Sequence, residues 1–358
     1  MAKIRVALIG IGNCASALVQ GCHFYRQARE GDQIPGVLRP RLGGYGIGDI
    51  EICLAVDVDR NKVGKDLGEA IFSPPNNTAI FHRVGKTGVT VSMGNPLDGV
   101  GEYLSRKIEP SAQRAIDLKR ALREEGVEVV VNFLPVGSQA ATEWYTEQAL
   151  EAGCGFVNCI PVFIARDAGW RQRFEQAGLP LIGDDIKSQL GATILHRQLA
   201  RLFSERGVFL ERTSQLNVGG NMDFYNMLER SRLESKKISK TEAVLSQLSR
   251  PLDPSDVHIG PSDYVPWLAD RKWAYIRMEG RSFGNLPVNL ELKLEVWDSP
   301  NAAGVAIDAL RCCKIGLDRG LKGALEGPCA YFMKSPPRQC SDHQALSMLE
   351  QFIGSNQA

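Results

Sequence analysis

Lysines that could hold and transform an anion are crowded into ESKKISK (234–240). On a helix, Lys236 and Lys240 would be i,i+4 neighbours on one face, whereas Lys237 would point elsewhere. Like charges at this spacing repel one another, so a bound anion would relieve the repulsion. Desolvation and neighbouring cations also lower the pKa of a lysine toward neutrality, which suits proton transfer. An ordinary solvated helix face is the alternative interpretation.

Other charged residues stand beside predicted strands, and α/β sheets bind ligands at the carboxyl ends of their strands. Lys272 comes directly before an apolar strand, Asp298 ends a strand, and Lys334 follows an aromatic and Met-rich stretch. GDDIKSQLG (183–191) and NVGGNMDF (217–224) place carboxylates next to glycines that allow close backbone approach. Taken singly, each lysine is better explained as a solvated surface charge, because lysine is almost never buried without a partner.

A glycine turn near the start of the chain predicts a dinucleotide-binding site. Gly10, Gly12 and Ala15 form GxGxxA, with Asn13 and Cys14 in the same turn, between an apolar strand and a helix-like stretch. Gly10 permits a tight turn, Gly12 lets a pyrophosphate approach the backbone, and Ala15 lets helix and strand pack closely. The pyrophosphate would rest on the helix N-terminus, where unpaired N–H groups favour an anion.

An aspartate at the end of the second predicted strand selects the kind of dinucleotide. The carboxylate of Asp57 can accept hydrogen bonds from ribose hydroxyls and repel a 2′-phosphate, which favours NAD over NADP. Its distance from the glycine turn exceeds the usual ~20 residues, because a Gly- and Pro-rich insertion occupies 29–49. Asp59 and Asp66 are less well placed alternatives for this contact. The alternative without a ligand is that Asp57 simply ends a strand at a turn.

The elements that must position these residues alternate between strand and helix over the first 190 residues. Continuous apolar runs predict strands buried in a parallel sheet; they lie at the start of the chain and at 50–59, 127–138, 155–165 and 179–185. The expected fold is therefore α/β, with a Rossmann-type doubly wound parallel sheet.

The pattern changes after residue 190 and predicts a second, α+β unit. Amphipathic helix 191–207 is followed by strand-like segments at 273–283 and 288–298, and the strict alternation of NLELKLEVW predicts an antiparallel, half-exposed strand. A buried helix is predicted at 302–320. We expect two interwoven domains, 1–190 and 191–301, with 302–358 completing the first.

Charge and composition exclude several classes of protein. The chain has 42 Lys+Arg and 41 Asp+Glu, a net charge of +1, which argues against a nucleic-acid-binding or membrane-surface protein. No apolar segment approaches the roughly 20 residues that span a bilayer. Nine cysteines without a CxxC pair, and histidines without metal-site spacing, predict structural thiols in a reducing cytoplasm and no metal site built by protein ligands alone.

Six segments, in order, resemble the myo-inositol-1-phosphate synthase family in its short, actinobacterial-like form. They are GDDIKSQLGATI, LNVGGNMDF, LESKKISKTEAV, HIGPSDYVPWLADRKWAY, LEVWDSPNAAGVAIDALR and FMKSPP. The resemblance implies an isomerase that makes 1L-myo-inositol 1-phosphate from D-glucose 6-phosphate, the first step of inositol biosynthesis, by NAD-dependent oxidation at C5, enolisation at C6, aldol closure onto C1 and return of the hydride.

The resemblance also assigns residues. The family's catalytic groups fall on Lys236, Lys240, Lys272, Lys334 and Asp298. Its cofactor contacts fall on the glycine turn and on Asp57, Asp66, Tyr145, Asp185, Ser188, Asp223 and Lys236. We hypothesise that Lys236 and Lys272 act at the C5 and C1 oxygens, that Lys240 and Lys334 hold phosphate, and that Asp298 orients a lysine. Lys187 is not assigned a catalytic role, because this chain has Gln189 and Gly191 where many relatives carry further lysines.

The resemblance further implies a cytoplasmic homotetramer that is assisted by a divalent cation, ammonium or potassium. Domain 1–190 would bind NAD, and 191–301 would carry catalysis and tetramerisation. Two alternatives stay open: a net NAD-dependent dehydrogenase of similar layout, and an NAD-binding regulator without turnover. Neither nucleic acid nor membrane is expected as a partner.

Overall fold

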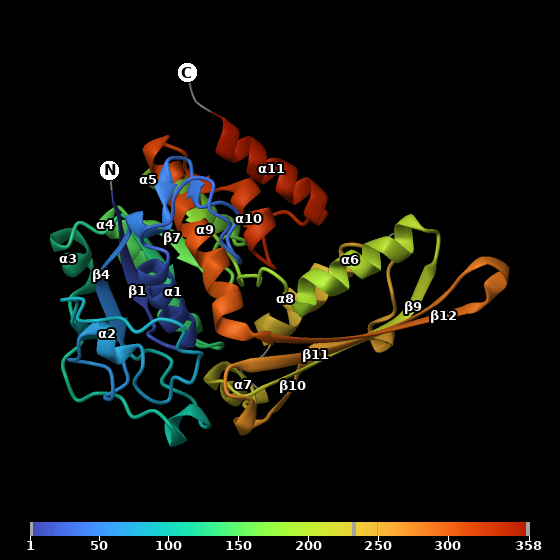
Figure 1. Ribbon diagram of the computed structural model, residues 1–358, viewed down its shortest axis with the longest axis horizontal. Coiled ribbons are helices and arrows are strands. Elements are labelled where there is room, and N and C mark those ends of the chain that lie inside the picture. The colour runs from blue at the N-terminus through green and yellow to red at the C-terminus, as the bar shows by residue number, and fades with distance from the viewer. Residues whose placement is uncertain (1–2, 231–233, 249, 356–358) are drawn as a thin grey trace.

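The computed structural model describes residues 3–230, 234–248 and 250–355, although the side chains of 234–237 and 261–262 lie outside the description (Figure 1). Its larger sheet has seven strands, all parallel, in the order β13-β8-β7-β6-β1-β4-β5. The predicted Rossmann-type sheet is confirmed. Its strands are β1 Ile4–Ile9, β4 Ile50–Asp57, β5 Val91–Met93, β6 Val129–Asn132, β7 Gly155–Asn158, β8 Pro180–Ile182 and β13 Gly323–Ala324.

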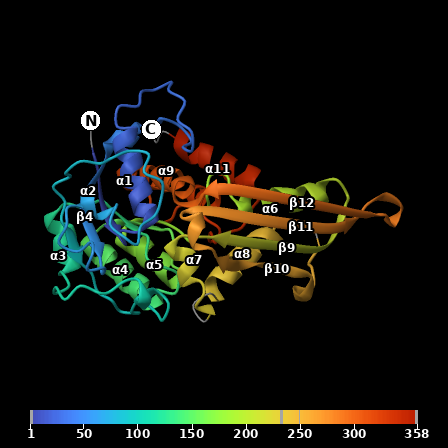
Figure 2. The ribbon, with the colours of Figure 1, turned by 60° about the horizontal axis from the view of Figure 1, so that its bottom comes forward.

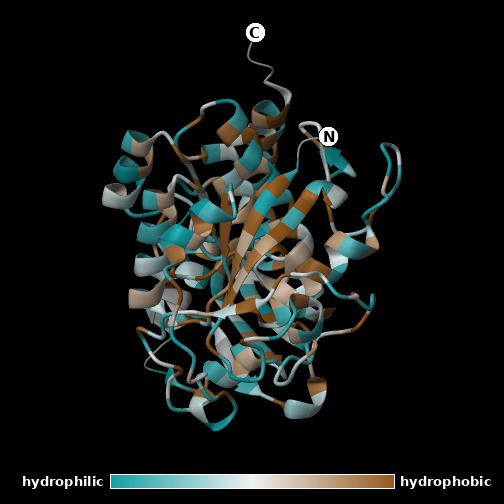
Figure 3. Ribbon diagram, turned by 90° about the vertical axis from the view of Figure 1, so that its left-hand side faces the viewer, coloured by the Kyte–Doolittle hydropathy of each residue, from teal (hydrophilic) through white to brown (hydrophobic). Residues whose placement is uncertain are grey.

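Helices cover both faces of this sheet, which explains why its strands are continuously apolar. Helices α1 (Asn13–Phe24) and α9 (Asp298–Asp318) pack against each other on one face. On the other face lie α3 (Leu118–Glu124), α4 (Gln139–Ala152) and α5 (Ala168–Ala177) (Figure 2). Hydrophobic strands run between more hydrophilic helices in Figure 3. The predicted helix 302–320 is α9, which begins four residues earlier.

The smaller sheet extends away from the larger one (Figure 1). Its order is β10-β9-β11-β12, with β10 parallel to β9 and β11 antiparallel to both of its neighbours. The predicted half-exposed antiparallel strand is β12, at the edge of the sheet. The four strands are β9 Phe209–Gly219, β10 Val257–Tyr264, β11 Arg271–Arg281 and β12 Pro287–Trp297.

Among the described residues, helices cover one face of the smaller sheet and leave the other face open. Helices α6 (Ala192–Glu205) and α8 (Glu234–Leu245) pack on it and on each other. They enclose a second apolar core around Phe203, Ile276 and Met278. Besides short 3-10 turns, the other described strands and α-helices are β2 Arg41–Leu42, β3 Tyr45–Gly46, α2 Leu67–Ala70, α7 Met222–Asn226, α10 Glu326–Phe332 and α11 Asp342–Gly354. Within the described ranges, no helix is both long enough and apolar enough to cross a bilayer.

Candidate active site

A cavity lies where the carboxyl ends of the parallel strands face the second sheet. Because all seven strands are parallel, the segments that follow β1, β4, β6, β7 and β8 meet at one edge, which includes the point where strand order reverses between β1 and β6. The predicted site residues that line the cavity are Gly10, Gly12, Asn13, Cys14, Asp57, Tyr145, Asp185, Ser188, Asp223, Lys240, Lys272, Asp298 and Lys334.

Two residues predicted as cofactor contacts, Ala15 and Asp66, are not part of this lining. Ala15 is fully buried in the core, where it serves helix packing. Asp66 caps α2 through the Gly68 N–H at 2.8 Å, also accepts the Gly88 N–H at 2.7 Å, and lies outside the cavity lining. Lys236 belongs to α8, but its side chain falls outside the described part of the structure, as does that of Lys237.

The glycine turn has the geometry that a pyrophosphate site requires. Gly10 adopts φ +89°, and a Cβ there would lie 2.8 Å from the carbonyl oxygen of Phe133, so only glycine fits. Gly12 is the N-cap of α1, and a Cβ there would meet nothing within 4 Å, which leaves the backbone open to a ligand. Among the described residues, no side chain caps α1 and no acidic residue occupies its first turn, so the helix N-terminus can receive an anion.

Asp57 and Tyr145 form part of the cavity wall beside this turn. The Asp57 carboxylate accepts the Ile11 N–H at 2.6 Å and the Val58 N–H at 2.7 Å, which fix it at the end of β4. The Tyr145 hydroxyl accepts the Asn95 N–H at 2.9 Å. Burial raises the Tyr145 pKa to about 12, so this phenol stays neutral.

A lysine–carboxylate pair comes from the segments after β8 and after α10. Lys334 Nζ donates to Asp185 Oδ1 at 2.7 Å, and Ser239 Oγ of α8 donates to Asp185 Oδ2 at 2.7 Å. Asp185 has φ +59°, a strained conformation for a residue other than glycine. Its backbone is held by the Lys334 N–H, which donates to the Asp185 carbonyl at 2.7 Å. The strained residue, Asp185, is therefore the one whose carboxylate holds the cavity lysine Lys334.

A second pair lies where β12 of the smaller sheet continues into α9. Lys272 Nζ, from β11, donates to Asp298 Oδ1 at 3.2 Å. Asp298 is the first residue of α9, where the helix dipole stabilises a carboxylate. Asp223, in the first turn of α7, and the largely buried Lys240 of α8 complete the charged wall.

Asp270 is a buried carboxylate that the sequence analysis did not single out. It is 0% exposed and accepts hydrogen bonds from Asn13 Nδ2 at 3.2 Å, Thr78 Oγ1 at 2.5 Å, Asn221 Nδ2 at 2.9 Å and Ser299 Oγ at 2.8 Å. The Ser299 N–H donates as well, at 3.2 Å. This one carboxylate therefore ties the glycine turn to the elements that carry the lysines. The sequence around Asp270 gives little indication of this role, because it shows only an acidic residue two positions before Lys272.

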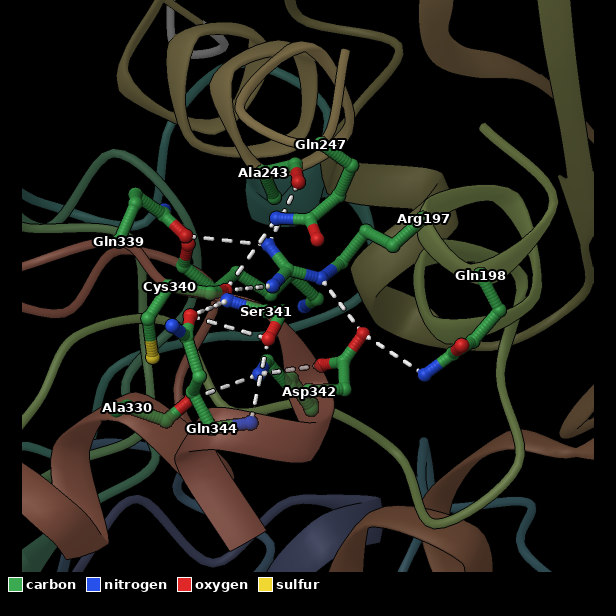
Figure 4. Close-up of polar contacts among 12 residues, drawn as sticks. Arg197, Gln198, Ala243, Gln247, Ala330, Gln339, Cys340, Ser341, Asp342 and Gln344 are labelled. Atoms are coloured by element: carbon green, nitrogen blue, oxygen red, sulfur yellow. Dashed lines mark hydrogen bonds and ion pairs between the residues drawn. The ribbon is translucent and has the colours of Figure 1, made fainter. Parts of the chain in front are cut away.

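Lys187 is not part of the cavity lining and belongs to a second buried cluster. Figure 4 shows Arg197, Ala243 and Asp342 of this cluster. The Lys187 ammonium group donates to the Ala330 carbonyl at 2.9 Å and to Asp342 Oδ1 at 3.4 Å. Burial, together with the charge of Arg197, lowers the Lys187 pKa to about 8. Arg197 donates to Asp342 Oδ2 at 3.2 Å and to the Ala243 carbonyl of α8 at 2.6 Å. This cluster anchors α8, which carries Lys240, against α11.

Thiols and metal ligands add no further chemistry among the residues described. All nine cysteines are free. Burial raises the pKa of Cys14, which lines the cavity, to about 12, so its thiol stays protonated. Over the described ranges, no group of three or more His, Cys, Asp or Glu side chains could hold a metal ion.

Comparison with known proteins gives a consistent result. A profile of the family described as myo-inositol-1-phosphate synthase matches residues 191–299. The inositol-3-phosphate synthase of Mycolicibacterium smegmatis is 56% identical over 355 residues, 98% of each chain. That of Corynebacterium glutamicum is 53% identical over 355 residues, again 98% of each.

Solved structures agree at the level of the fold. The crystal structure of Ari2 has a TM-score of 0.80 at 35% identity, with 98% of each chain covered. A myo-inositol-1-phosphate synthase-related protein from Thermotoga maritima has a TM-score of 0.81 at 25% identity, also with 98% of each chain covered. Both sheets and their relative placement are therefore shared with these proteins.

Proposed function

Because the chain belongs to the myo-inositol-1-phosphate synthase family, we propose that it is an isomerase that converts D-glucose 6-phosphate to 1L-myo-inositol 1-phosphate with bound NAD. One observation carries the proposal: lysines and aspartates that could bind a phosphate and transfer protons share a cavity with a dinucleotide-type glycine turn. These residues are Lys240, Lys272, Lys334, Asp185, Asp223 and Asp298.

The residues of the turn fit NAD. The open backbone at Gly12 and the uncapped N-terminus of α1 would receive the pyrophosphate, and the Asp57 carboxylate would accept the ribose hydroxyls. Ser188, Asp223 and Tyr145 line the same space and would contact the rest of the cofactor. When bound, NAD supplies a hydride acceptor for C5 and a hydride donor for the final reduction.

The lysines would bind the substrate phosphate and neutralise negative charge that develops during the reaction. We assign Lys240 and Lys334 to the dianionic phosphate, which needs cationic partners, and Asp185 would fix Lys334 in place. Lys272 would neutralise negative charge that develops on a substrate oxygen during enolisation and aldol closure, because Asp298 holds its ammonium group at the cavity wall. Lys236, whose side chain lies outside the description, is assigned to the other of the C5 and C1 oxygens from the resemblance alone.

Purified protein incubated with glucose 6-phosphate and catalytic NAD tests this function. We expect inositol phosphate by NMR and no net change in absorbance at 340 nm. NADH that accumulates in proportion to product would identify a net dehydrogenase instead, and NAD binding without turnover would identify a regulator. Replacing Lys272 or Lys334 with Met should abolish turnover in a folded protein, whereas Lys322→Met, at an exposed lysine, should not.

Domain roles and assembly belong to the same proposal. Residues 1–190 with 302–358 would bind NAD, and 191–301 would carry catalysis and tetramerisation. Leu216 and Tyr275 pair across β9 and β11 on the uncovered face of the smaller sheet and are 41% and 40% exposed, so this face would pack on another copy. Light scattering should give a tetramer, and Tyr275→Glu should dissociate it.

The activating ion and the compartment can be tested directly. We propose that a divalent cation, ammonium or potassium assists turnover, with the substrate phosphate as one ligand of a divalent ion. Chelation followed by addition of each ion alone should identify it. A cytoplasmic location is proposed from the nine free thiols, and cell fractionation tests it.

A further inference from the structure

A buried lysine lies beside the carboxylate proposed to bind the ribose. The side chain of Lys62 is 4% exposed and lines the cavity. Its ammonium nitrogen is 3.8 Å from Asp57 Oδ2 and 3.8 Å from Asp59 Oδ2. Both distances are within ion-pair range but too long for a hydrogen bond. Across the described residues, no hydrogen bond from this ammonium group is found, although an ammonium has three hydrogens to donate.

Burial of an ammonium group without acceptors is costly, so a ligand that supplies them would be favoured. Solvent hardly reaches Lys62, and its open side is the cavity next to Asp57. The ligand atoms expected there are the hydroxyl oxygens of the adenosine ribose, which accept as well as donate hydrogen bonds. A carboxylate and an ammonium side by side complement such a diol, because one accepts its protons and the other donates to its oxygens.

We propose that Lys62 is a cofactor-specificity residue: it donates to the ribose oxygens of bound NAD, and the Asp57–Lys62 pair, rather than Asp57 alone, sets the preference for NAD over NADP. This inference rests on the proposed NAD function. Lys62 by itself would attract a 2′-phosphate, and the adjacent Asp57 charge opposes it. Lys62 could therefore bind the 2′-phosphate of NADP, but the negative charge of Asp57 repels that phosphate.

A purely structural role for Lys62 makes different predictions. Asp59 is 0% exposed, burial raises its pKa, and its Oδ2 has no hydrogen-bond partner among the described residues. Lys62 could therefore serve only to neutralise Asp59. However, Asp59 lies outside the cavity lining, whereas Lys62 and Asp57 are part of it. Removal of the Asp59 charge separates the two roles, because it leaves the cavity side of Lys62 unchanged.

Dissociation constants for NAD and NADP, measured by calorimetry on the full chain, test the inference. Lys62→Met should weaken NAD binding about tenfold, the usual effect of losing a hydrogen bond to a charged donor. Asp57→Asn should gain NADP binding, and adding Lys62→Met should reduce that gain at least about tenfold. Combined with Asp57→Asn, Lys62→Arg should retain the gain in NADP binding. The controls Asp59→Asn and Lys65→Met, the latter at a lysine paired with Glu69 on the surface, should leave the NAD-to-NADP ratio unchanged.

The outcomes distinguish the inference from the function on which it rests. Equal NADP binding by Asp57→Asn with and without Lys62→Met would overturn the inference alone. So would Lys62→Met that lowers the melting temperature but leaves both dissociation constants unchanged. No NAD binding by the unaltered protein would overturn the proposed function as well. If Asp57→Asn fails to fold, the NAD affinities of Lys62→Met and Lys62→Arg decide: only the methionine variant should bind NAD more weakly, and equal NAD affinity in both variants and the unaltered protein would overturn the inference.

Discussion

Asp270→Asn changes one oxygen at the centre of the junction between the two sheets. Oδ1 of Asp270 accepts from Asn13, Asn221 and the Ser299 hydroxyl, and Oδ2 accepts from Thr78 and the Ser299 N–H. An asparagine must turn its NH₂ group toward one of these two sets. On the Oδ2 side, the Thr78 hydroxyl can rotate and accept, but the Ser299 N–H cannot, so at least one buried donor loses its partner.

The expected cost follows from these contacts. A hydrogen bond to a charged group contributes about 1.5–3 kcal/mol, and a buried unsatisfied donor costs about 1–3 kcal/mol. Relief of a buried charge offsets part of this, because burial and the Asp298 charge raise the Asp270 pKa. We therefore expect Asp270→Asn to lower the free energy of unfolding by about 3 kcal/mol. Because Asn13 belongs to the glycine turn, NAD affinity should fall as well.

Denaturant unfolding of the two proteins, with and without NAD, measures both effects. The control is Asp263→Asn, at an exposed carboxylate that accepts the neighbouring Tyr264 N–H; it should change stability by less than about 0.5 kcal/mol. A loss below about 1 kcal/mol for Asp270→Asn, with unchanged NAD affinity, would refute the view that this carboxylate joins the two halves of the site.

Three further predictions concern the buried charges and thiols. Asp342→Ala leaves Lys187 and Arg197 without their shared carboxylate and should cost about 3–5 kcal/mol in denaturant unfolding at pH 7; a change near zero would contradict the buried cluster. The Lys187 pKa is about 8 in the fold against 10.5 when unfolded, so its charged form is penalised below pH 8 and the penalty disappears as pH rises to 10.5. The wild type should therefore gain up to about 3 kcal/mol relative to Lys187→Met between pH 7.5 and 10.5, and a flat difference would be inconsistent with this shift. Cys14, with its pKa at about 12, should resist iodoacetamide at pH 8 as followed by mass spectrometry, and rapid alkylation would show a thiolate.

Much of the fold was predictable because its signals are local. Strands β1 and β6 are mostly apolar, and the turn after β1 has the GxGxxA pattern, with Gly10 at a positive φ. Alternation along β12 likewise gave its half-exposed, antiparallel character. The three-dimensional neighbours of Asp270 carry no such local signal. Its hydrogen-bond partners Asn13 and Thr78 lie 257 and 192 residues away in the chain, so no window of sequence contains them together.

Lys187 and Lys334 show why residue type and position at a strand end do not suffice to find a site. Strand periodicity would place Asp185 and Lys187 on the same face, two residues apart. Asp185 instead has a positive φ, and its carboxylate meets Lys334 at the cavity while Lys187 turns toward Asp342. Strand β8 ends at Ile182, so strand periodicity no longer applies at 185–187, and an aspartate at 185 gives no sequence signal for a positive φ.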